Sequence, residues 1–387
     1  MSTIPVRSWV LALGTFAVGT DAFVVAGFLP EMAADLRVSE AAAGQSVTVF
    51  AFAYALGSPV LATLTARVPR RGLVLTALVV LGLANLGSAL ACDLGVLMVT
   101  RVVAALGAAA YTPNAGAAAA ALSAPRHRAR ALSVVVGGLT IATALGVPLG
   151  SLAAQQLGWR GALALVAVLA LAAAPAARAV LPELPGNPRV PLRERLAVLR
   201  HPSVVRVLPL TVMGMGAAYT AYAYSVPALA GVGVGAIGPM LFLYGAGAVA
   251  GNLLSGHATD RWGARPVLAA GYTVMALTMA ALACLAWLAA SGVRLPVLVG
   301  VLMAAWGASS WCQTPPQQHR LITAAPAEAA LLVSLNSSAI YSGIGLGTVL
   351  GGLALTAGTT WLYGAAALLA TLSLAYTARQ ADTEMSS

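Results

Sequence analysis

The hydrophobic positions of this chain fall into long runs that are separated by short polar connections. Each run is about 20 residues long, which is the length that an α-helix needs to cross the hydrocarbon core of a bilayer. A transmembrane β-barrel would instead show alternating segments of about ten residues, and these uniform runs do not alternate. The pattern predicts an all-α membrane protein with twelve transmembrane helices, over residues 9–30, 44–66, 72–92, 95–119, 131–154, 160–181, 207–231, 236–258, 266–290, 295–317, 329–352 and 357–378.

The composition excludes a soluble protein of this length. Charged residues make up 8% of the 387 residues, hydrophobic residues make up 60%, and the mean hydropathy is +0.88. An ordinary soluble domain has about 25% charged residues. The first run is longer than the apolar core of a secretory signal and follows a single basic residue, Arg7, so we expect it to be retained as a helix.

The basic residues are distributed unevenly between the two sides of the predicted bundle. All 21 are arginines, and if the N-terminus is cytoplasmic, 17 of them lie in the ends and connections on that side. Only Arg37, Arg160 and Arg294 lie on the opposite side, and Arg101 lies within a helix. Such a bias predicts that both termini are in the cytoplasm of a protein of the plasma membrane. The net charge of +10 therefore reflects topology and does not indicate a nucleic-acid partner.

The longest polar connection, residues 182–206, divides the chain near its midpoint. It is rich in proline and arginine, and six predicted helices lie on each side of it, within residues 1–181 and 207–387. The stretch "TARVPRRGLVL" from Thr65 matches "TDRWGARPVLA" from Thr259 at an offset of 194 residues. An internal repeat of this length predicts two pseudo-symmetric six-helix halves joined by a cytoplasmic linker. Transporters built in this way place the substrate near the midplane, between the halves.

Two charged residues lie well inside the predicted helices. Asp21 is the only charge between Trp9 and Pro30, within "GTDAFVVAGFLP", and Arg101 is seven residues into the fourth helix. At about 1.5 Å per residue, both side chains are about 20 Å from the cytoplasmic face. Since each charge alone would cost about 2.5–3.5 kcal/mol at the membrane centre, we expect the two to face each other or a water-filled cavity.

The Asp21–Arg101 pair has two interpretations. It either only fixes the first and fourth helices, or it carries a proton. Charged groups inside a membrane are generally functional, which favours the proton site. A nearby guanidinium favours the charged form of a carboxyl, and burial favours the neutral form. A carboxyl whose guanidinium partner moves during transport can therefore bind a proton from one side and release it to the other.

Four stretches resemble the major facilitator superfamily, and within it the twelve-helix drug:proton antiporters of the arabinose and chloramphenicol efflux group. They are the opening stretch with Asp21, where the group more often has glutamate, and "LMVTRVVAALGAAA", "GGLTIATALGVPLGS" and "GHATDRWGAR". The resemblance covers nearly the whole chain. It implies proton coupling by Arg101, which is followed by Gly107 as in the family's fourth helix.

The resemblance also implies roles for the other two stretches. In the fifth helix, Gly138, Gly146, Pro148 and Gly150 correspond to the motif typical of antiporters, with Ala142 at an intermediate small position. In the connection after the eighth helix, the family uses an acid and basic groups as a latch between helix ends, and these correspond to Asp260, Arg261, Gly263 and Arg265. The first-half copy departs from this pattern, because Ala66 replaces the acid and Pro69 replaces the glycine, so that latch is weakened or lost.

Polar and aromatic residues inside the runs are candidates for a substrate cavity. We expect the lining to include Tyr111, Asn114, Tyr219, Tyr222, Trp306 and Gln313, with Tyr224 and Trp311 as further candidates. A mostly apolar cavity with aromatic faces and few polar groups suits an amphipathic, drug-like molecule. Ordinary helix packing is the alternative for each of these residues taken singly.

These observations predict a monomeric, multi-pass plasma-membrane transporter that exports a small, largely apolar compound in exchange for protons, without a cofactor or metal. Two alternatives stay open: proton-coupled import of a sugar or metabolite, against which the motif of the fifth helix argues, and a membrane receptor that does not transport. An intramembrane enzyme is disfavoured, because the sequence lacks a spaced His/Glu metal motif, a nucleophile elbow and a nucleotide-binding loop.

Overall fold

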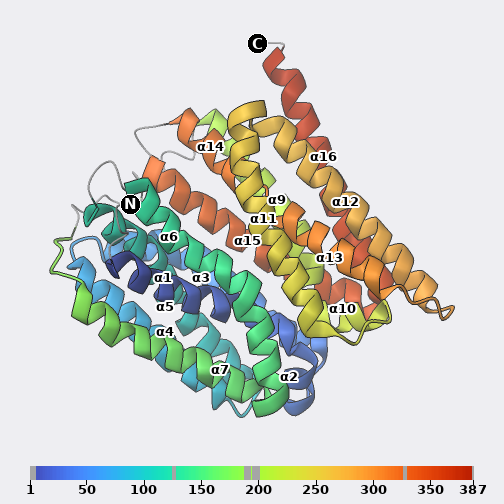
Figure 1. Cartoon of the computed structure of the whole chain (residues 1–387), viewed down its shortest axis with the longest axis horizontal. Helices are drawn as coiled ribbons and strands as arrows, with labels where there is room; N and C mark the ends of the chain where they lie inside the picture. Colours follow the sequence, from blue (N-terminus) through green and yellow to red (C-terminus); the bar gives the residue numbers. More distant parts are fainter. Residues whose placement is uncertain (1–5, 124–127, 187–192, 194–200, 326–328, 386–387) are drawn as a thin grey trace.

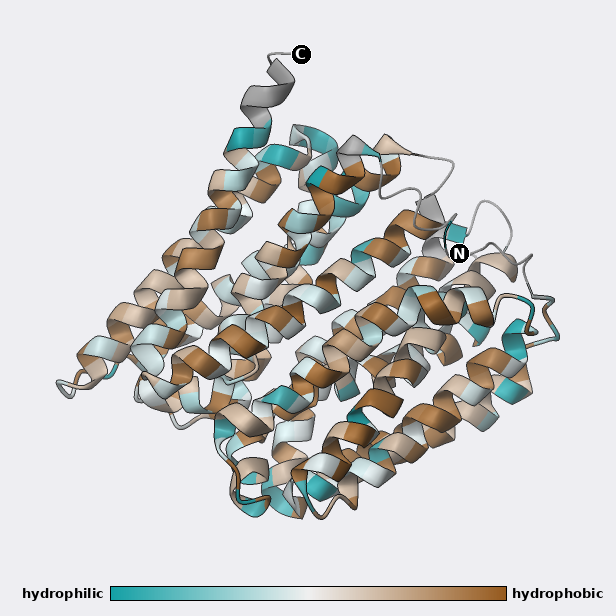
Figure 2. Ribbon diagram, turned by 180° about the vertical axis from the view of Figure 1, so that it is seen from behind, coloured by the Kyte–Doolittle hydropathy of each residue, from teal (hydrophilic) through white to brown (hydrophobic). Residues whose placement is uncertain are grey.

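The computed structural model describes residues 6–123, 128–186, 193, 201–325 and 329–385, and all regular secondary structure in these ranges is helical. Eleven helices in this part of the chain are long and apolar enough to cross a membrane. Figure 2 shows hydrophobic residues along the helices and hydrophilic residues mainly near their ends. Large aliphatic side chains are exposed on the outer surface, for example Leu254, Leu277 and Leu353, each by more than 60%. A continuous apolar surface of this kind is suited to lipid as its solvent.

The helices before residue 187 contact mainly one another. They are α1 (Val6–Phe23), the 3₁₀ turn η1 (Val24–Gly27), α2 (Leu29–Asp35), α3 (Glu40–Leu64), α4 (Arg70–Ala89), α5 (Leu94–Ala121), α6 (Arg128–Ile141), the π-helical turn η3 (Ala142–Gly146) and α7 (Val147–Val180). Within this group α4 packs against α5 and α7, and α1 packs against α6. We call these helices the first group.

The helices after residue 200 form a second group. They are α9 (Pro202–Tyr222), α10 (Ser225–Gly231), α11 (Ile237–Trp262), α12 (Ala264–Ala289), α13 (Pro296–Trp311), α14 (Thr314–Ala324), α15 (Ala329–Thr356) and α16 (Thr359–Met385). The main contacts are those of α9 with α15, α11 with α13, and α12 with α16. Close approach of α15 to α9 depends on Gly343, Gly347 and Gly351, which are spaced by four residues and face the backbone of α9.

The two groups meet along α3 and α15, and along α11 with η3 and α7. Figure 1 shows that α1 begins and α16 ends at one end of the bundle, while α2 and α10 lie at the other. We call these the terminal end and the α2–α10 end. At the α2–α10 end, α10 contacts both α2 and η1, so the groups are joined there.

A glycine divides the longest apolar segment, residues 131–180. Its 50 residues would span about 75 Å as a straight helix, far more than the hydrocarbon core of about 30 Å. Gly158 has φ 72° and ψ 166°, which glycine adopts readily and which interrupts the helix. The break lies between the predicted helices 131–154 and 160–181. Beside it, Arg160 pairs with Asp35 of α2, and Trp159 Nε1 donates a hydrogen bond to the same carboxylate over 3.0 Å.

The first helix of each group is interrupted, whereas the sequence predicts unbroken helices over 9–30 and 207–231. In the first group α1 gives way to η1 and then to α2; in the second, α9 ends at Tyr222 and α10 begins at Ser225. Pro30 and Pro227 explain both breaks, because proline has no N–H to bond the carbonyl four residues earlier. The two breaks occupy corresponding places in the two groups, as interrupted helices of transporters do.

Candidate functional site

The two charges inside the first group form one ion pair between α1 and α5. Arg101 Nη1 donates to Asp21 Oδ1 over 2.5 Å, and Arg101 Nη2 donates to the backbone oxygen of Asp21 over 3.0 Å. Both side chains have no exposed surface. Asp21 lies in the last turn of α1, where backbone carbonyls have no helical N–H to accept from. Arg101 provides the donor for one of these carbonyls, that of Asp21. The structure thus brings together the two residues that the sequence predicts to share a depth.

One aromatic ring lies against the pair, which is incompletely hydrogen-bonded. The guanidinium carbon of Arg101 lies 4.7 Å from the centroid of the Phe50 ring, an arrangement that stabilises the cation. Asp21 Oδ2 and Arg101 Nε have no hydrogen-bond partner among the described residues. Asp21 therefore has one oxygen held by the guanidinium and one without a partner among these residues.

The residues of the antiporter motif line the face of α6, η3 and α7 that packs on α1. A β-carbon at Gly138 would contact the backbone of Ala12, and β-carbons at Gly146 and Gly150 would contact side chains of α1 and η1. The π-helical turn η3 ends two residues before Pro148, which cannot donate to the carbonyl four residues earlier. The motif thus lets this helix approach α1 beside the turn that carries Asp21.

The π-helical turn η3 also contacts the second group. A β-carbon at Gly245 of α11 would contact the backbone of Thr143 and Ala144 within η3. The antiporter motif therefore lies between α1 on one side and α11 on the other. A change in the geometry of η3 would affect both the packing of α1 and the junction between the two groups.

The predicted latch lies at the terminal end, where Gly263 turns the chain from α11 into α12 with φ 83°. Asp260 and Arg261 are exposed, and Asp260 forms no ion pair with the described residues. Arg265 Nη2 donates to the backbone oxygen of Gln380 in α16 over 2.9 Å. In the first group Arg71 Nη2 donates to the backbone oxygen of Arg178 in α7 over 3.1 Å. These two arginines, 194 residues apart, each fix the last helix of their own group.

Three of the predicted lining residues lie together in an aromatic cluster of the second group. Tyr219 and Tyr222 have ring centroids 5.1 Å apart, and Tyr222 lies 6.1 Å from Trp306. Tyr244 of α11 and Tyr363 of α16 also contact Trp306, with centroids 5.1 and 6.4 Å away. The sequence analysis missed these two tyrosines, although both are polar aromatic residues inside predicted helices and the same criterion would have selected them.

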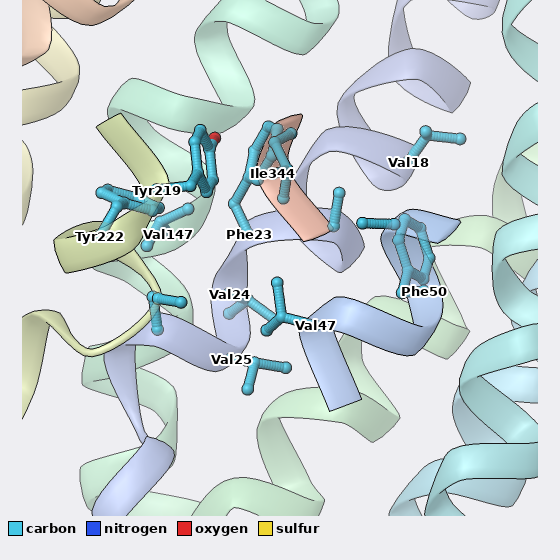
Figure 3. Packing of buried hydrophobic residues seen from close by; sticks show 14 of the residues in the cluster. Val18, Phe23, Val24, Val25, Val47, Phe50, Val147, Tyr219, Tyr222 and Ile344 are labelled. Atoms are coloured by element: carbon cyan, nitrogen blue, oxygen red, sulfur yellow. The ribbon is translucent and has the colours of Figure 1, made fainter. Parts of the chain in front are cut away.

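One aromatic side chain of the first group joins this cluster. Phe23, two residues after Asp21, lies 5.7 Å from Tyr219 and 6.0 Å from Trp311, between ring centroids. Figure 3 shows Phe23, Tyr219 and Tyr222 together at the junction of the two groups, with Val147 beside them. The last turn of α1 thus carries the ion pair and, through Phe23, the contact with the aromatic cluster.

The chain can now be compared with known proteins. Residues 11–316 match the family model described as Major Facilitator Superfamily. The chain belongs to the major facilitator superfamily. This member of the superfamily is 31% identical over 353 residues to the uncharacterized MFS-type transporter YbcL of Bacillus subtilis (strain 168), which covers 90% of this chain and 88% of that protein. It is also 35% identical over 280 residues to the chloramphenicol resistance protein of Streptomyces lividans, covering 69% and 70% of the two chains.

The fold of this superfamily member is shared with solved transporters. A bacterial homologue of the human lysosomal transporter Spinster, in an inward-facing and unoccupied conformation, aligns with a TM-score of 0.77 over 97% of both chains. Sequence identity to that structure is 16%, so the similarity concerns the fold. Together with the apolar helices, these comparisons show a multi-pass membrane transporter.

Four other candidate residues of the transporter have hydrogen-bond partners outside the aromatic cluster. Tyr111 Oη donates to the backbone oxygen of Leu11 over 2.9 Å, and Asn114 bonds its own helix. Tyr224 Oη donates to the backbone oxygen of Thr348, and Gln313 accepts from Tyr272 Oη and donates to the backbone oxygen of Ser310. Tyr111, Tyr224 and Gln313 thereby join different helices, whereas the bond of Asn114 stays within α5. Within the described ranges no three His, Cys, Asp or Glu side chains lie close enough to hold a metal.

Proposed function

We propose that this transporter exports a small, largely apolar compound across the bacterial plasma membrane in exchange for protons. The observation that carries the proposal is the Asp21–Arg101 pair, which is fully buried and leaves one carboxylate oxygen without a partner in the described part of the chain. The antiporter motif packed along α1 supports export over import, and so does the resemblance to a chloramphenicol resistance protein. No cofactor, metal or catalytic step is part of this proposal.

Proton binding acts on the pair as follows. With Asp21 ionised, both the carboxylate and the backbone oxygen hold Arg101. A proton at Oδ2 removes the attraction between opposite charges and leaves a hydrogen bond from the charged guanidinium to a neutral carboxyl, which is weaker than the ion pair. The last turn of α1 is then held less tightly, and Phe23 and the η3 contact move with it. Proton binding from outside thereby changes the junction with the second group.

The proposed topology has twelve crossings, in halves of residues 1–181 and 207–387 joined by the linker 182–206, with both termini cytoplasmic. Most of this linker lies outside the described residues. The matching bonds of Arg71 and Arg265 support the repeat, and the Gly158 break supports two crossings within residues 131–180. With the termini inside, the contacts of α10 with α2 and η1 lie on the outside. The two halves are then joined at the outer ends of their helices.

Reporter fusions test this topology. A reporter after Arg200, which lies outside the described residues, should be cytoplasmic, because most arginines flank that side. A reporter at Ser39, the N-cap of α3 at the α2–α10 end, should be external. Alkaline phosphatase, active only outside, and green fluorescent protein, fluorescent only inside, give opposite readouts at each position. A fluorescent Ser39 fusion would reverse the proposed orientation.

The latch is tested by Asp260→Asn, which keeps the shape of the side chain. Asp260 forms no ion pair with the described residues in this arrangement, so we expect it to form its bonds in another conformation of the transport cycle. Losing a hydrogen bond to a charged group costs about 1.5–3 kcal/mol, so transport should slow by roughly tenfold or more while substrate affinity changes little. The matched first-half change, Ala66→Asp, should leave transport unchanged or slightly faster. A parental rate in Asp260→Asn vesicles would remove the latch from the mechanism.

Everted membrane vesicles separate the candidate functions. Respiration acidifies their interior, so an exporter that exchanges substrate for protons should accumulate chloramphenicol or a related compound, and a protonophore should abolish the uptake. A proton-coupled importer would move substrate out of such vesicles instead. A receptor that does not transport would show neither movement. Vesicles that accumulate no compound from an antibiotic panel would contradict the proposal.

A further inference from the structure

The aromatic cluster contains polar atoms that have nothing to bond. Tyr219, Trp306 and Tyr363 are each exposed by 1% or less. Tyr219 Oη, Trp306 Nε1 and Tyr363 Oη have no hydrogen-bond partner among the described residues. Leaving a buried donor or acceptor unsatisfied costs about 1–3 kcal/mol for each group, and native proteins have few such groups. The Oη atom of Tyr244 in the same cluster is unpartnered within the described ranges too, and four such groups in one connected cluster indicate that a bound molecule completes the hydrogen bonds.

The chemistry of these atoms limits what that molecule can be. An indole N–H only donates, so a partner of Trp306 must provide an acceptor. The two tyrosine hydroxyls can donate to further acceptors. The rings of the cluster meet edge-on or tilted at 4.5–6.4 Å, which is the geometry in which flat rings also pack well against a ligand. Every member of the cluster is uncharged, so the ring faces are the only attraction it offers a cation, and no carboxylate neutralises the cation's charge.

We propose that this cluster is the substrate site of the exporter, and that it selects neutral, flat aromatic compounds carrying hydrogen-bond acceptors such as carbonyl, nitro or ether oxygens. The assignment rests on the proposed export function and specifies its substrate class. Trp306, Tyr219 and Tyr363 provide the hydrogen bonds, and Tyr222 and Tyr244 provide the ring faces.

Phe23 places this site next to the proton site. It packs on Tyr219 and Trp311 from α1, and it is two residues from Asp21. The rings of the cluster contact one another in the described arrangement, so a ligand enters by displacing Phe23 from Tyr219. That displacement moves the turn that Arg101 holds. Substrate and proton thus act on the same turn of α1.

Binding to the purified transporter in detergent tests the site without any gradient. The neutral probes are chloramphenicol, coumarin and a flavone, and the charged probe is tetraphenylphosphonium, an aromatic cation without an acceptor. We expect at least one neutral probe to bind, and tetraphenylphosphonium to bind at least tenfold more weakly. In Trp306→Phe, which keeps a ring but loses the N–H, the Kd of the neutral probe should rise roughly tenfold, the effect of one lost hydrogen bond.

Two further variants keep the result interpretable. Trp361→Phe changes a tryptophan that is 67% exposed on α16, and it should bind like the parent. Tyr363→Phe removes only an unpartnered hydroxyl, so it should fold at least as well as the parent while binding the neutral probe more weakly. An unchanged Kd in both Trp306→Phe and Tyr363→Phe, tighter binding of the cation, or no binding of any neutral probe would each overturn the assignment.

The binding and vesicle experiments can fail independently. If vesicles accumulate a compound in response to a proton gradient but the cluster variants bind it with an unchanged Kd, the substrate site is assigned wrongly and the antiport function stands. The expected binding pattern without gradient-driven uptake would keep the site and remove the antiport.

Discussion

Everted vesicles containing Asp21→Asn should show no uptake driven by a proton gradient, whereas the parent accumulates substrate. Asparagine keeps an oxygen where Asp21 Oδ1 accepts from Arg101, so the hydrogen bonds of the pair are largely retained. What it lacks is a group that binds a proton at the position of Oδ2. Uptake per folded transporter should fall to the level of empty vesicles, and substrate exchange without a gradient should continue.

Arg101→Ala should also abolish driven uptake, for a different reason. The carboxyl then lies in an apolar site without its cation, and burial without a partner favours the neutral form. The proton would bind and fail to leave. Removing one partner of a buried pair also costs about 3–5 kcal/mol of stability, so folded yield must be measured with transport.

The double variant Asp21→Asn with Arg101→Gln separates the two interpretations of the pair. Both charges are gone, so a pair that only joins α1 and α5 would be replaced without an unpaired charge, and yield and transport should both recover. We expect the yield to recover and the driven uptake to stay absent. Proton-driven export by the double variant at close to the parental rate would show that Asp21 is structural.

Gly347→Val should prevent most of the chain from reaching a folded, monodisperse state. Gly347 is the middle of the three glycines on α15, and a β-carbon there would contact the backbone of Gly216 in α9. Backbone atoms cannot move aside as a side chain can by changing its rotamer. The loss of folding free energy should therefore be at least as large as that of typical overpacking, about 1–3 kcal/mol. The measurement is the monodisperse fraction in size-exclusion chromatography and the Tm of that fraction.

Gly364→Val is the matched control for this change. Gly364 lies on α16, and apart from its chain neighbours and the adjacent backbone of its own helix, no described atom lies within 4 Å of where its β-carbon would be placed. The same substitution there adds the same side chain without a contact, so yield and Tm should stay close to the parent. Equal yields for Gly347→Val and Gly364→Val would mean that α9 and α15 do not depend on this close approach.

The depth of the charged residues could be predicted from the sequence because a helix rises by a fixed amount per residue. Counting from Trp9 and Leu94 placed Asp21 and Arg101 at one level, and the structure joins them. Family membership was also predicted, from motifs whose residues are close in the chain, and the match over residues 11–316 confirms it. Both inferences depend only on the spacing of residues along one helix or one short stretch. Neither requires knowing which face of a helix packs against which other helix.

Predicting the aromatic cluster requires knowing which face of each helix meets which neighbouring helix, and the sequence does not provide this. A helix that is apolar all round gives no periodic signal for its packing direction. Tyr111 and Tyr222 are both tyrosines near the middle of predicted helices, yet one bonds α1 and the other joins the cluster. The breaks in α1 and α9 are not predicted because residues 22–30 and the run 207–231 contain no charged residue that would mark an interruption. The roles of Asp21, Arg101 and Asp260 remain predictions until the variants are measured.

Arg101 holds α1 by two bonds, and only the one to the carboxylate depends on charge. The bond to the backbone oxygen of Asp21 has no titratable acceptor, so it persists when the proton arrives. Under the proposed mechanism α1 and α5 therefore stay attached throughout the cycle, and the proton alters the stiffness of their junction. Transport by such a junction should vary gradually with external acidity, without a threshold below which the helices separate.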